Sequence, residues 1–332
     1  MEDENKNYLI GAIERADSIA ISGHVRPDGD AIGSTMGLYY YLQENYPDKT
    51  VCVYLEDVPD SFAHIRDEEA MERRLEHYDL FIALDSGDVE RLGDAGEVMK
   101  NNSDYVINVD HHITNTLFGN KNIVDAKASS TCQILFTLMD EDRISKLTAM
   151  ALYTGIIHDT GVFKHNNTSY QTMRIAGKLM RKGIAFGEII DSSFYSKTYK
   201  QLQIMGKCLT ESVRVMDGLV IFAVMRLKDM VFYQANPSDL DGVIDELRTT
   251  EGVEVAILLS EREPDEFKVS LRSNQIVDVA SIAKYYGGGG HIKASGCTMH
   301  GTYREIINLL TSHIDRQLNA GEYFDDDEDE DD

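Results

Sequence analysis

The chain has 332 residues, and its 32 lysines and arginines against 57 aspartates and glutamates give a formal net charge of −25 at pH 7. Hydrophobic residues make up 42% and charged residues 27%, an ordinary balance for a soluble globular protein. So negative a chain disfavours a broad basic surface for long nucleic acid, whereas a small anionic substrate stays compatible with a site that brings its own cations. The chain has no run of about 18 apolar residues, and its N-terminus is acidic and polar, so we expect a cytoplasmic protein without membrane contact.

The first half of the chain alternates short apolar runs with amphipathic stretches. Strands are expected at Ser18–Ser22, Val51–Leu55, Leu80–Leu84 and Tyr105–Val109. Helices are expected at Ala31–Gln43, Thr131–Met139, Lys146–His158 and Ser169–Arg181. The strand candidates are mainly β-branched or apolar rather than alternating, which is typical of strands buried on both faces. The alternation predicts an α/β domain over residues 1–190, with a parallel sheet and helices on both sides.

The pattern changes after a polar and aromatic stretch, residues 191–206, which we interpret as a linking helix. Strands are then expected at Val213–Val215, Leu219–Met225, Val253–Leu259 and Phe267–Leu271. Helices are expected at Ser238–Arg248, Val277–Tyr285 and about Tyr303–Leu318. These elements predict a second, smaller α/β domain over residues 207–320. The acidic segment 321–332 is expected to be a disordered, solubilising tail.

Four clusters of aspartate and histidine follow predicted elements of the first half. They are His24 with Asp28 and Asp30, then Asp85, then Asp110-His111-His112, and last His158-Asp159 at a helix end. Ligands of open parallel sheets bind beyond the carboxyl ends of the strands, so the first three clusters are expected to converge there. Each cluster alone could be a helix cap, a turn or surface histidines. Their joint position at one edge favours a functional site.

The donor atoms of these clusters indicate which ions could bind. Aspartate and histidine together suit Mn²⁺, Co²⁺ or Fe²⁺, and carboxylates also suit Mg²⁺. The four cysteines stand far apart, which argues against a disulfide scaffold and a thiolate zinc site. Several carboxylates packed without cations would repel one another, and two divalent ions would remove that conflict. Ions roughly 3.5–4 Å apart are the usual arrangement for hydrolysing phosphoesters, so the clusters predict a two-metal hydrolytic site.

The second half contributes four consecutive glycines, Gly287 to Gly290, followed by His291. Such a run costs backbone entropy, and its benefit would be close approach of backbone N–H groups to an anion. A flexible linker is the alternative, although a linker rarely separates an amphipathic helix from a strand. Arg272 ends a predicted strand and is a candidate for bidentate phosphate binding. Its spacing alone favours the plainer reading, an exposed arginine at a strand end.

These motifs, in this order and spacing, resemble the DHH phosphoesterase superfamily over about residues 5–320. The resemblance rests on Asp110-His111-His112, the earlier clusters at His24 to Asp30 and at Asp85, and Gly287–His291. The last of these looks like the signature of the DHH-associated C-terminal domain, which binds substrate or nucleic acid. The size and two-domain build are most similar to NrnA-type enzymes. Those are nanoRNases, or oligoribonucleases, that also dephosphorylate 3′-phosphoadenosine 5′-phosphate (pAp).

The resemblance implies a role for each matching residue. One ion would be held by His24, Asp28 and Asp85, and the other by Asp30, Asp85, His111 and Asp159, with Asp85 bridging. His112 would contact the scissile phosphate, and Asp110 would orient a histidine. The terminal phosphate or base would be bound by Arg272, Gly288, Gly289, Gly290 and His291. Two Mn²⁺ ions are the expected cofactor, with Mg²⁺ or Co²⁺ as substitutes.

The expected reaction is hydrolysis of short RNA, of linear dinucleotides such as pApA or pGpG, or of pAp, by a hydroxide that bridges the two ions. A homodimer is compatible with the sequence. A RecJ-like exonuclease on longer single strands would require a basic groove and aromatic side chains that stack on bases. The negative net charge and the absence of tryptophan argue against this alternative. A non-catalytic nucleotide sensor would be expected to lack a ligand, and every expected ligand is present. A family II pyrophosphatase would not need the glycine run, and a membrane-bound cyclic-dinucleotide phosphodiesterase would need further N-terminal domains.

Overall fold

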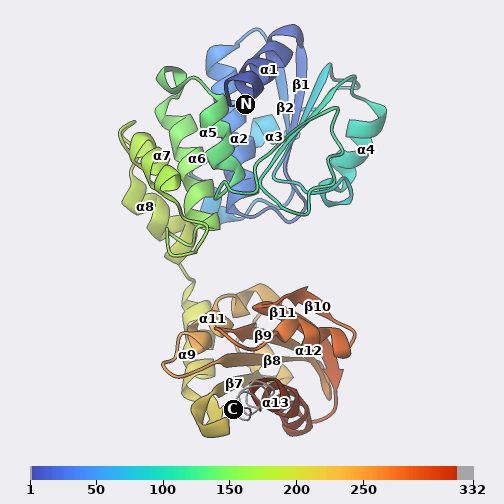
Figure 1. Ribbon diagram of the computed structural model, residues 1–332, viewed down its shortest axis with the longest axis vertical. Helices are drawn as coiled ribbons and strands as arrows, with labels where there is room; N and C mark the ends of the chain where they lie inside the picture. Colours follow the sequence, from blue (N-terminus) through green and yellow to red (C-terminus); the bar gives the residue numbers. More distant parts are fainter. Residues whose placement is uncertain (1, 320–332) are drawn as a thin grey trace, which may run out of the picture. The chain divides into compact units, whose positions relative to one another are not determined.

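The computed structural model describes residues 2–319, and the tail predicted at 321–332 lies outside the described residues. The chain divides into two compact units, Met1–Ser196 and Lys197–Asp332, and Figure 1 shows the elements of each. Within residues 2–319, no helix combines the length and the apolar character that crossing a membrane requires.

The first unit is built on a five-stranded parallel sheet with the strand order β2-β1-β3-β4-β5. The strands are β1 (Ser18–Ser22), β2 (Thr50–Tyr54), β3 (Leu80–Leu84), β4 (Val106–Asp110) and β5 (Lys121–Val124). The helices are α1 (Glu2–Arg15), α2 (Gly29–Asn45), α3 (Glu68–Glu72), α4 (Asp94–Asn101), α5 (Thr131–Leu138), α6 (Lys146–Asp159), α7 (Tyr170–Met180) and α8 (Phe186–Ile190). The predicted parallel sheet is confirmed.

Helices cover both faces of this sheet, and Figure 1 shows α4 on the opposite side from α1, α2, α5 and α6. Alternate residues of a strand point to opposite faces. Accordingly, Ile82 and Leu84 of β3 belong to the core under α1, α2, α5 and α6. Phe81 and Ala83 of the same strand pack against α4 through Met99 and its neighbours. Burial on both faces explains why this strand reads as a continuous apolar run.

The second unit contains a six-stranded mixed sheet with the order β10-β11-β9-β8-β7-β6, in which β7 and β8 run parallel. The strands are β6 (Val213–Val215), β7 (Val220–Met225), β8 (Val255–Glu263), β9 (Glu266–Ser273), β10 (Gly289–His291) and β11 (Ala294–His300). The helices are α9 (Tyr199–Thr210), α10 (Leu227–Phe232), α11 (Val243–Arg248), α12 (Val279–Tyr285) and α13 (Tyr303–Asn319). One sheet face packs on α12 and α13, and the other packs on α9 and α11.

Two of the predicted helices are broken in the structure. The stretch 191–206 is not one helix, because a π-helical turn, Asp191–Tyr195, precedes an extended Ser196, and α9 begins only at Tyr199. Thr198 and Gln201 form a capping box, which starts a new helix at that point. The helix expected at Ser238–Arg248 is divided into a 3₁₀ turn, Pro237–Leu240, and α11. Gly242 lies between them in the left-handed region at φ +83° and interrupts helical geometry.

Candidate metal centre and substrate surface

The carboxyl ends of the adjacent strands β1, β3 and β4 carry most of the predicted ligands. The loop after β1 holds His24, Asp28 and Asp30, and Asp85 follows β3 directly. Asp110 is the last residue of β4, so His111 and His112 leave the sheet at the same edge. Asp159 is the last residue of α6 and supplies the remaining carboxylate. Segments more than a hundred residues apart in the chain thus meet at one place.

The side chains form three overlapping groups in which all donor atoms lie within 4.8 Å of one another. The groups are His24-Asp28-Asp85, Asp30-His111-Asp159 and Asp85-His111-His112. Asp85 belongs to two of them because its carboxylate oxygens face different histidines. Oδ2 lies 3.8 Å from His24 Nε2, and Oδ1 lies 3.5 Å from His111 Nε2. A carboxylate placed in this way can bridge two ions.

The loop after β1 shows how one aspartate can serve the fold and the site together. Asp28 Oδ1 accepts the backbone N–H groups of Asp30 and Ala31 and so caps α2. Its other oxygen, Oδ2, lies 3.6 Å from His24 Nε2. Burial raises the pKa of Asp28, but the hydrogen bonds from His24 and Ala31 outweigh burial and bring it to about 2. The capping oxygen and the oxygen available to an ion are therefore different atoms.

Asp110 holds the second histidine of the triplet in place. Its Oδ1 accepts a hydrogen bond from His112 Nδ1 at 2.7 Å, and its Oδ2 accepts one from Asn115 Nδ2 at 2.6 Å. Burial raises the pKa of this carboxyl, but the contacts with His112 and Asn115 lower it below its usual value. A histidine that donates through Nδ1 keeps Nε2 as its free ring nitrogen. The contact agrees with the orienting role expected for Asp110.

The electrostatics of the cluster indicate a need for cations. Burial, and then the charge of Asp159, raises the pKa of Asp30 to about 7. Burial and the charge of Asp30 raise the pKa of Asp85 to about 8. The pKa of His111 rises to about 10, because its hydrogen bond to Asp159 and the charge of Asp30 outweigh burial. Protons thus neutralise part of the cluster, and divalent ions would replace them, so the donor set fits such ions.

The second unit places Arg272 and the glycine run on one sheet. The run is not a flexible linker, because Gly289–His291 is the edge strand β10 of a hairpin with β11. The register sets His291 opposite Ala294, and Ala294 opposite Arg272. Opposed residues share a face, so His291 and Arg272 project to the same side of the sheet. The Arg272 Nε atom lies 3.5 Å from Asp245 Oδ1, and the side chain is 30% exposed.

Two further polar residues, which sequence reasoning missed, extend this surface. Lys268 and Ser270 alternate with Arg272 along β9, whereas Val269 and Leu271 point into the core under α12 and α13. Lys268 is exposed. The period-two alternation of the segment FKVSLRS was the signal that could have identified both residues.

The glycines of the run differ in what surrounds them. A Cβ atom on Gly288 would lie 2.2 Å from the carbonyl oxygen of Gly296, so this position requires glycine. Gly290 has φ +141°, and a Cβ there would lie 2.5 Å from the carbonyl oxygen of Ala294. Gly289 is exposed and would meet nothing within 4 Å. The hairpin therefore requires glycine at 288 and 290, whereas Gly287 and Gly289 have open space around them.

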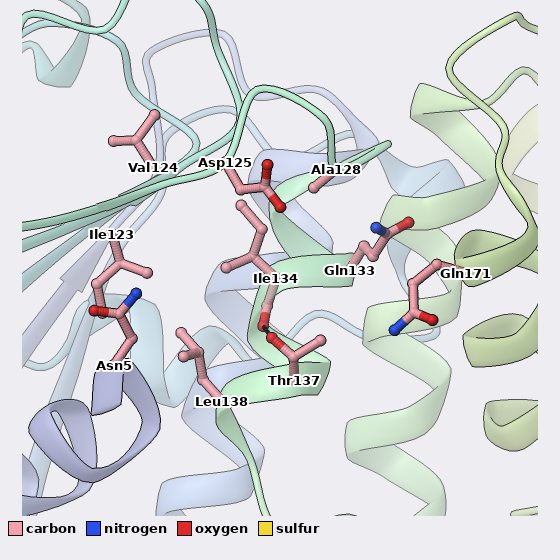
Figure 2. A pocket seen from close by; sticks show the side chains of 10 residues that line it. All are labelled: Asn5, Ile123, Val124, Asp125, Ala128, Gln133, Ile134, Thr137, Leu138 and Gln171. Atoms are coloured by element: carbon pink, nitrogen blue, oxygen red, sulfur yellow. Dashed lines mark hydrogen bonds between the residues drawn. The ribbon is translucent and has the colours of Figure 1, made fainter. Parts of the chain in front are cut away.

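A separate pocket of about 330 Å³ lies in the first unit beside the edge strand β5, among α1, α5 and α7 (Figure 2). Its polar lining includes the amides of Asn5, Gln133 and Gln171, and its apolar lining includes Ile123 and Leu138. None of the predicted ligands lines it. The three groups of donor atoms are therefore not part of this cavity.

Comparisons with known proteins agree with these motifs. Residues 18–156 match the N-terminal domain of the DHH family, and residues 219–320 match the DHHA1 domain. The chain is 31% identical over 309 residues to the bifunctional oligoribonuclease and PAP phosphatase NrnA of Thermus thermophilus, covering 90% of each chain. The protein of that name from Bacillus subtilis is 27% identical, over 89% of this chain and 93% of its own. An exopolyphosphatase-related protein from Bacteroides fragilis has a similar structure, with a TM-score of 0.82 at 26% identity, covering 95% of this chain and 96% of that one. By this identity and coverage, the chain belongs to the DHH family of phosphoesterases.

Proposed function

We propose that the chain is a two-metal, Mn²⁺-type phosphoesterase that hydrolyses short oligoribonucleotides, linear dinucleotides and pAp. The position of Asp85 supports this most directly, because its two oxygens face His24 on one side and His111 on the other. Similarity to proteins named oligoribonuclease and PAP phosphatase supports the choice of substrates.

The proposed ligand sets follow the groups of donor atoms. His24, Asp28 and Asp85 would hold one ion. Asp30, His111 and Asp159, with Asp85 as the shared carboxylate, would hold the other. Two divalent ions bound there would neutralise charge on a phosphate and lower the pKa of a coordinated water.

Each unit has polar groups that would bind the substrate. His112 is half-exposed, and its Nδ1 donates to Asp110. This hydrogen bond raises the pKa of His112, so the protonated ring would donate from Nε2 to a phosphate oxygen. On the second unit, Arg272, Lys268 and His291 share one sheet face and would bind a terminal phosphate or base. The excess of acidic over basic side chains favours a short substrate, because long nucleic acid is held by many contacts between basic side chains and phosphates.

A hydrolysis panel tests the proposed function. The substrates are pAp, pApA, a five-nucleotide RNA, a twenty-nucleotide single strand and pyrophosphate, each with Mn²⁺ and with EDTA. We expect Mn²⁺-dependent turnover of pAp, pApA and the five-nucleotide RNA, and little turnover of the other two. Preference for the twenty-nucleotide strand would favour an exonuclease of RecJ type. Tight nucleotide binding without any turnover would instead identify a sensor.

Replacing Arg272 with alanine tests the substrate surface. We expect KM for pAp to rise about 10- to 100-fold with kcat little changed, because a hydrogen bond to a charged group contributes roughly 1.5–3 kcal/mol. Steady-state kinetics measure both constants. Arg262→Ala, near the far end of the neighbouring strand β8, is the matched control and should leave KM unchanged. An equal KM for the Arg272 variant and the wild type would mean that Arg272 does not bind the substrate and is only an exposed arginine at the end of a strand.

A further inference from the structure

The start of α5 contacts two carboxylates of the metal-binding groups at once. The backbone N–H of Thr131 donates to Asp30 Oδ2 at 2.6 Å, and that of Cys132 donates to Asp30 Oδ1 at 3.0 Å. The hydroxyl of Thr131 donates to Asp85 Oδ1 at 3.0 Å. Thr131 and Asp30 are fully buried, and Asp85 is 2% exposed. A single residue therefore touches a carboxylate of the second ligand set and the shared carboxylate.

We propose that Thr131 is a positioning residue that sets the spacing between Asp30 and Asp85 and thereby supports binding of the second ion. The inference rests on the two-metal function proposed above. The Thr131 backbone fixes Asp30, whose two oxygens both accept from α5. Its side chain fixes one oxygen of Asp85. Such outer contacts orient metal ligands, and removing one typically costs about 10- to 100-fold in metal affinity or activity.

The hydroxyl of Thr131 is suited to this task because it leaves Asp85 able to bind an ion. A carboxylate oxygen has two lone pairs, so Oδ1 can accept one hydrogen bond and still face a cation. The Cys132 thiol does not duplicate the contact, since its Sγ lies 3.8 Å from the backbone oxygen of Asp30. The bond from Thr131 to Asp85 spans 46 residues of sequence and is a purely tertiary contact.

The backbone of Thr131 is held by contacts that do not involve the ligands. Ser130 caps α5 by accepting the N–H of Gln133, and Gln133 Oε1 accepts from the hydroxyls of Ser129 and Thr172. The neighbouring helix α6 approaches closely, since a Cβ on Gly155 would lie 2.3 Å from Cys132 Sγ. The start of α5 is therefore a fixed reference against which the two carboxylates are placed.

Mn²⁺ binding to full-length variants tests the inference without relying on turnover. Thr131→Val keeps the shape and the backbone N–H but removes the hydroxyl, and Thr131→Ser keeps the hydroxyl. Thr137→Val is the matched control on the same helix, where the hydroxyl donates to the backbone oxygen of Ile134. Calorimetry gives the number and affinity of bound ions, and electron paramagnetic resonance detects spin coupling between two neighbouring Mn²⁺ ions.

We expect Thr131→Val to weaken one of the two Mn²⁺ sites about 10- to 100-fold and to lose the coupled signal at limiting Mn²⁺. The serine variant and Thr137→Val should keep both sites near wild-type affinity. Thr131→Ala replaces the valine variant if circular dichroism shows that the latter does not fold. Wild-type affinity at both sites in the hydroxyl-free variant would overturn the role of Thr131 alone. Fewer than two ions bound by the wild type would overturn the two-metal function and this inference with it.

Discussion

Asp85→Asn is expected to lower Mn²⁺-dependent hydrolysis of pAp and pApA by roughly a thousandfold or more. The amide keeps the shape of the side chain but loses the charge that two groups of donor atoms share. Charge stabilisation by a bound ion contributes several kcal/mol to a phosphoryl transition state, and each 1.36 kcal/mol is about tenfold in rate. Steady-state kinetics measure the loss of turnover, and Mn²⁺ calorimetry on the same preparation measures the loss of ion binding.

Asp88→Asn is the matched control for that experiment. Asp88 lies three residues further along the same loop, where its Oδ1 accepts the backbone N–H of Arg91, and it belongs to none of the three groups. This variant should keep wild-type turnover and both ions. Circular dichroism distinguishes a lost site from a lost fold. An Asp85→Asn enzyme within tenfold of wild type, or one that still binds two ions equally well, would contradict the bridging assignment.

The first sheet and its edge could be predicted because buried parallel strands have a recognisable sequence pattern, and because the strand order determines which residues lie at one edge. A strand covered by helices on both faces is mainly apolar rather than alternating, and β1 and β3 have the bounds that the sequence predicts. Residues that leave adjacent parallel strands meet at one edge. For that reason Asp85, His111 and the loop after β1 could be expected to lie together before any distance was known.

The second sheet was harder to predict at its edge. β10 consists of two glycines and a histidine, none of which favours a strand, and pairing with β11 alone defines it. The proposed role of Thr131 also could not be predicted from the sequence. The residue is part of an ordinary Ser-Ser-Thr helix start, and its contact with Asp30 crosses 101 residues of chain. Such contacts depend on how α5 packs, which local patterns do not encode.

The metal-free protein is expected to lose stability as the pH rises from about 4 through 8. The pKa values of Asp30 and Asp85 in the fold, about 7 and about 8, lie above the ordinary value of 3.8. Between these values the folded state holds more protons than the unfolded state, so the free energy of unfolding falls with pH. His111, raised from 6.5 to about 10, continues the decline at higher pH. Two lowered pKa values have the opposite sign. That of Asp28, about 2, acts only below about pH 4. That of His158, which burial lowers from 6.5 to about 4, offsets part of the decline between about pH 4 and pH 6.5.

Urea unfolding at successive pH values, in EDTA and in saturating Mn²⁺, measures this decline. We expect a loss on the order of a few kcal/mol between pH 5 and pH 9 in EDTA, since one unit of pKa shift corresponds to about 1.36 kcal/mol. Mn²⁺ should oppose the loss increasingly as the pH rises, because an ion binds the deprotonated groups and releases their protons. The Asp85→Asn variant, which cannot titrate at this position, should show a shallower decline in EDTA. Equal slopes for the variant and the wild type would mean that protons on Asp85 do not stabilise the metal-free fold.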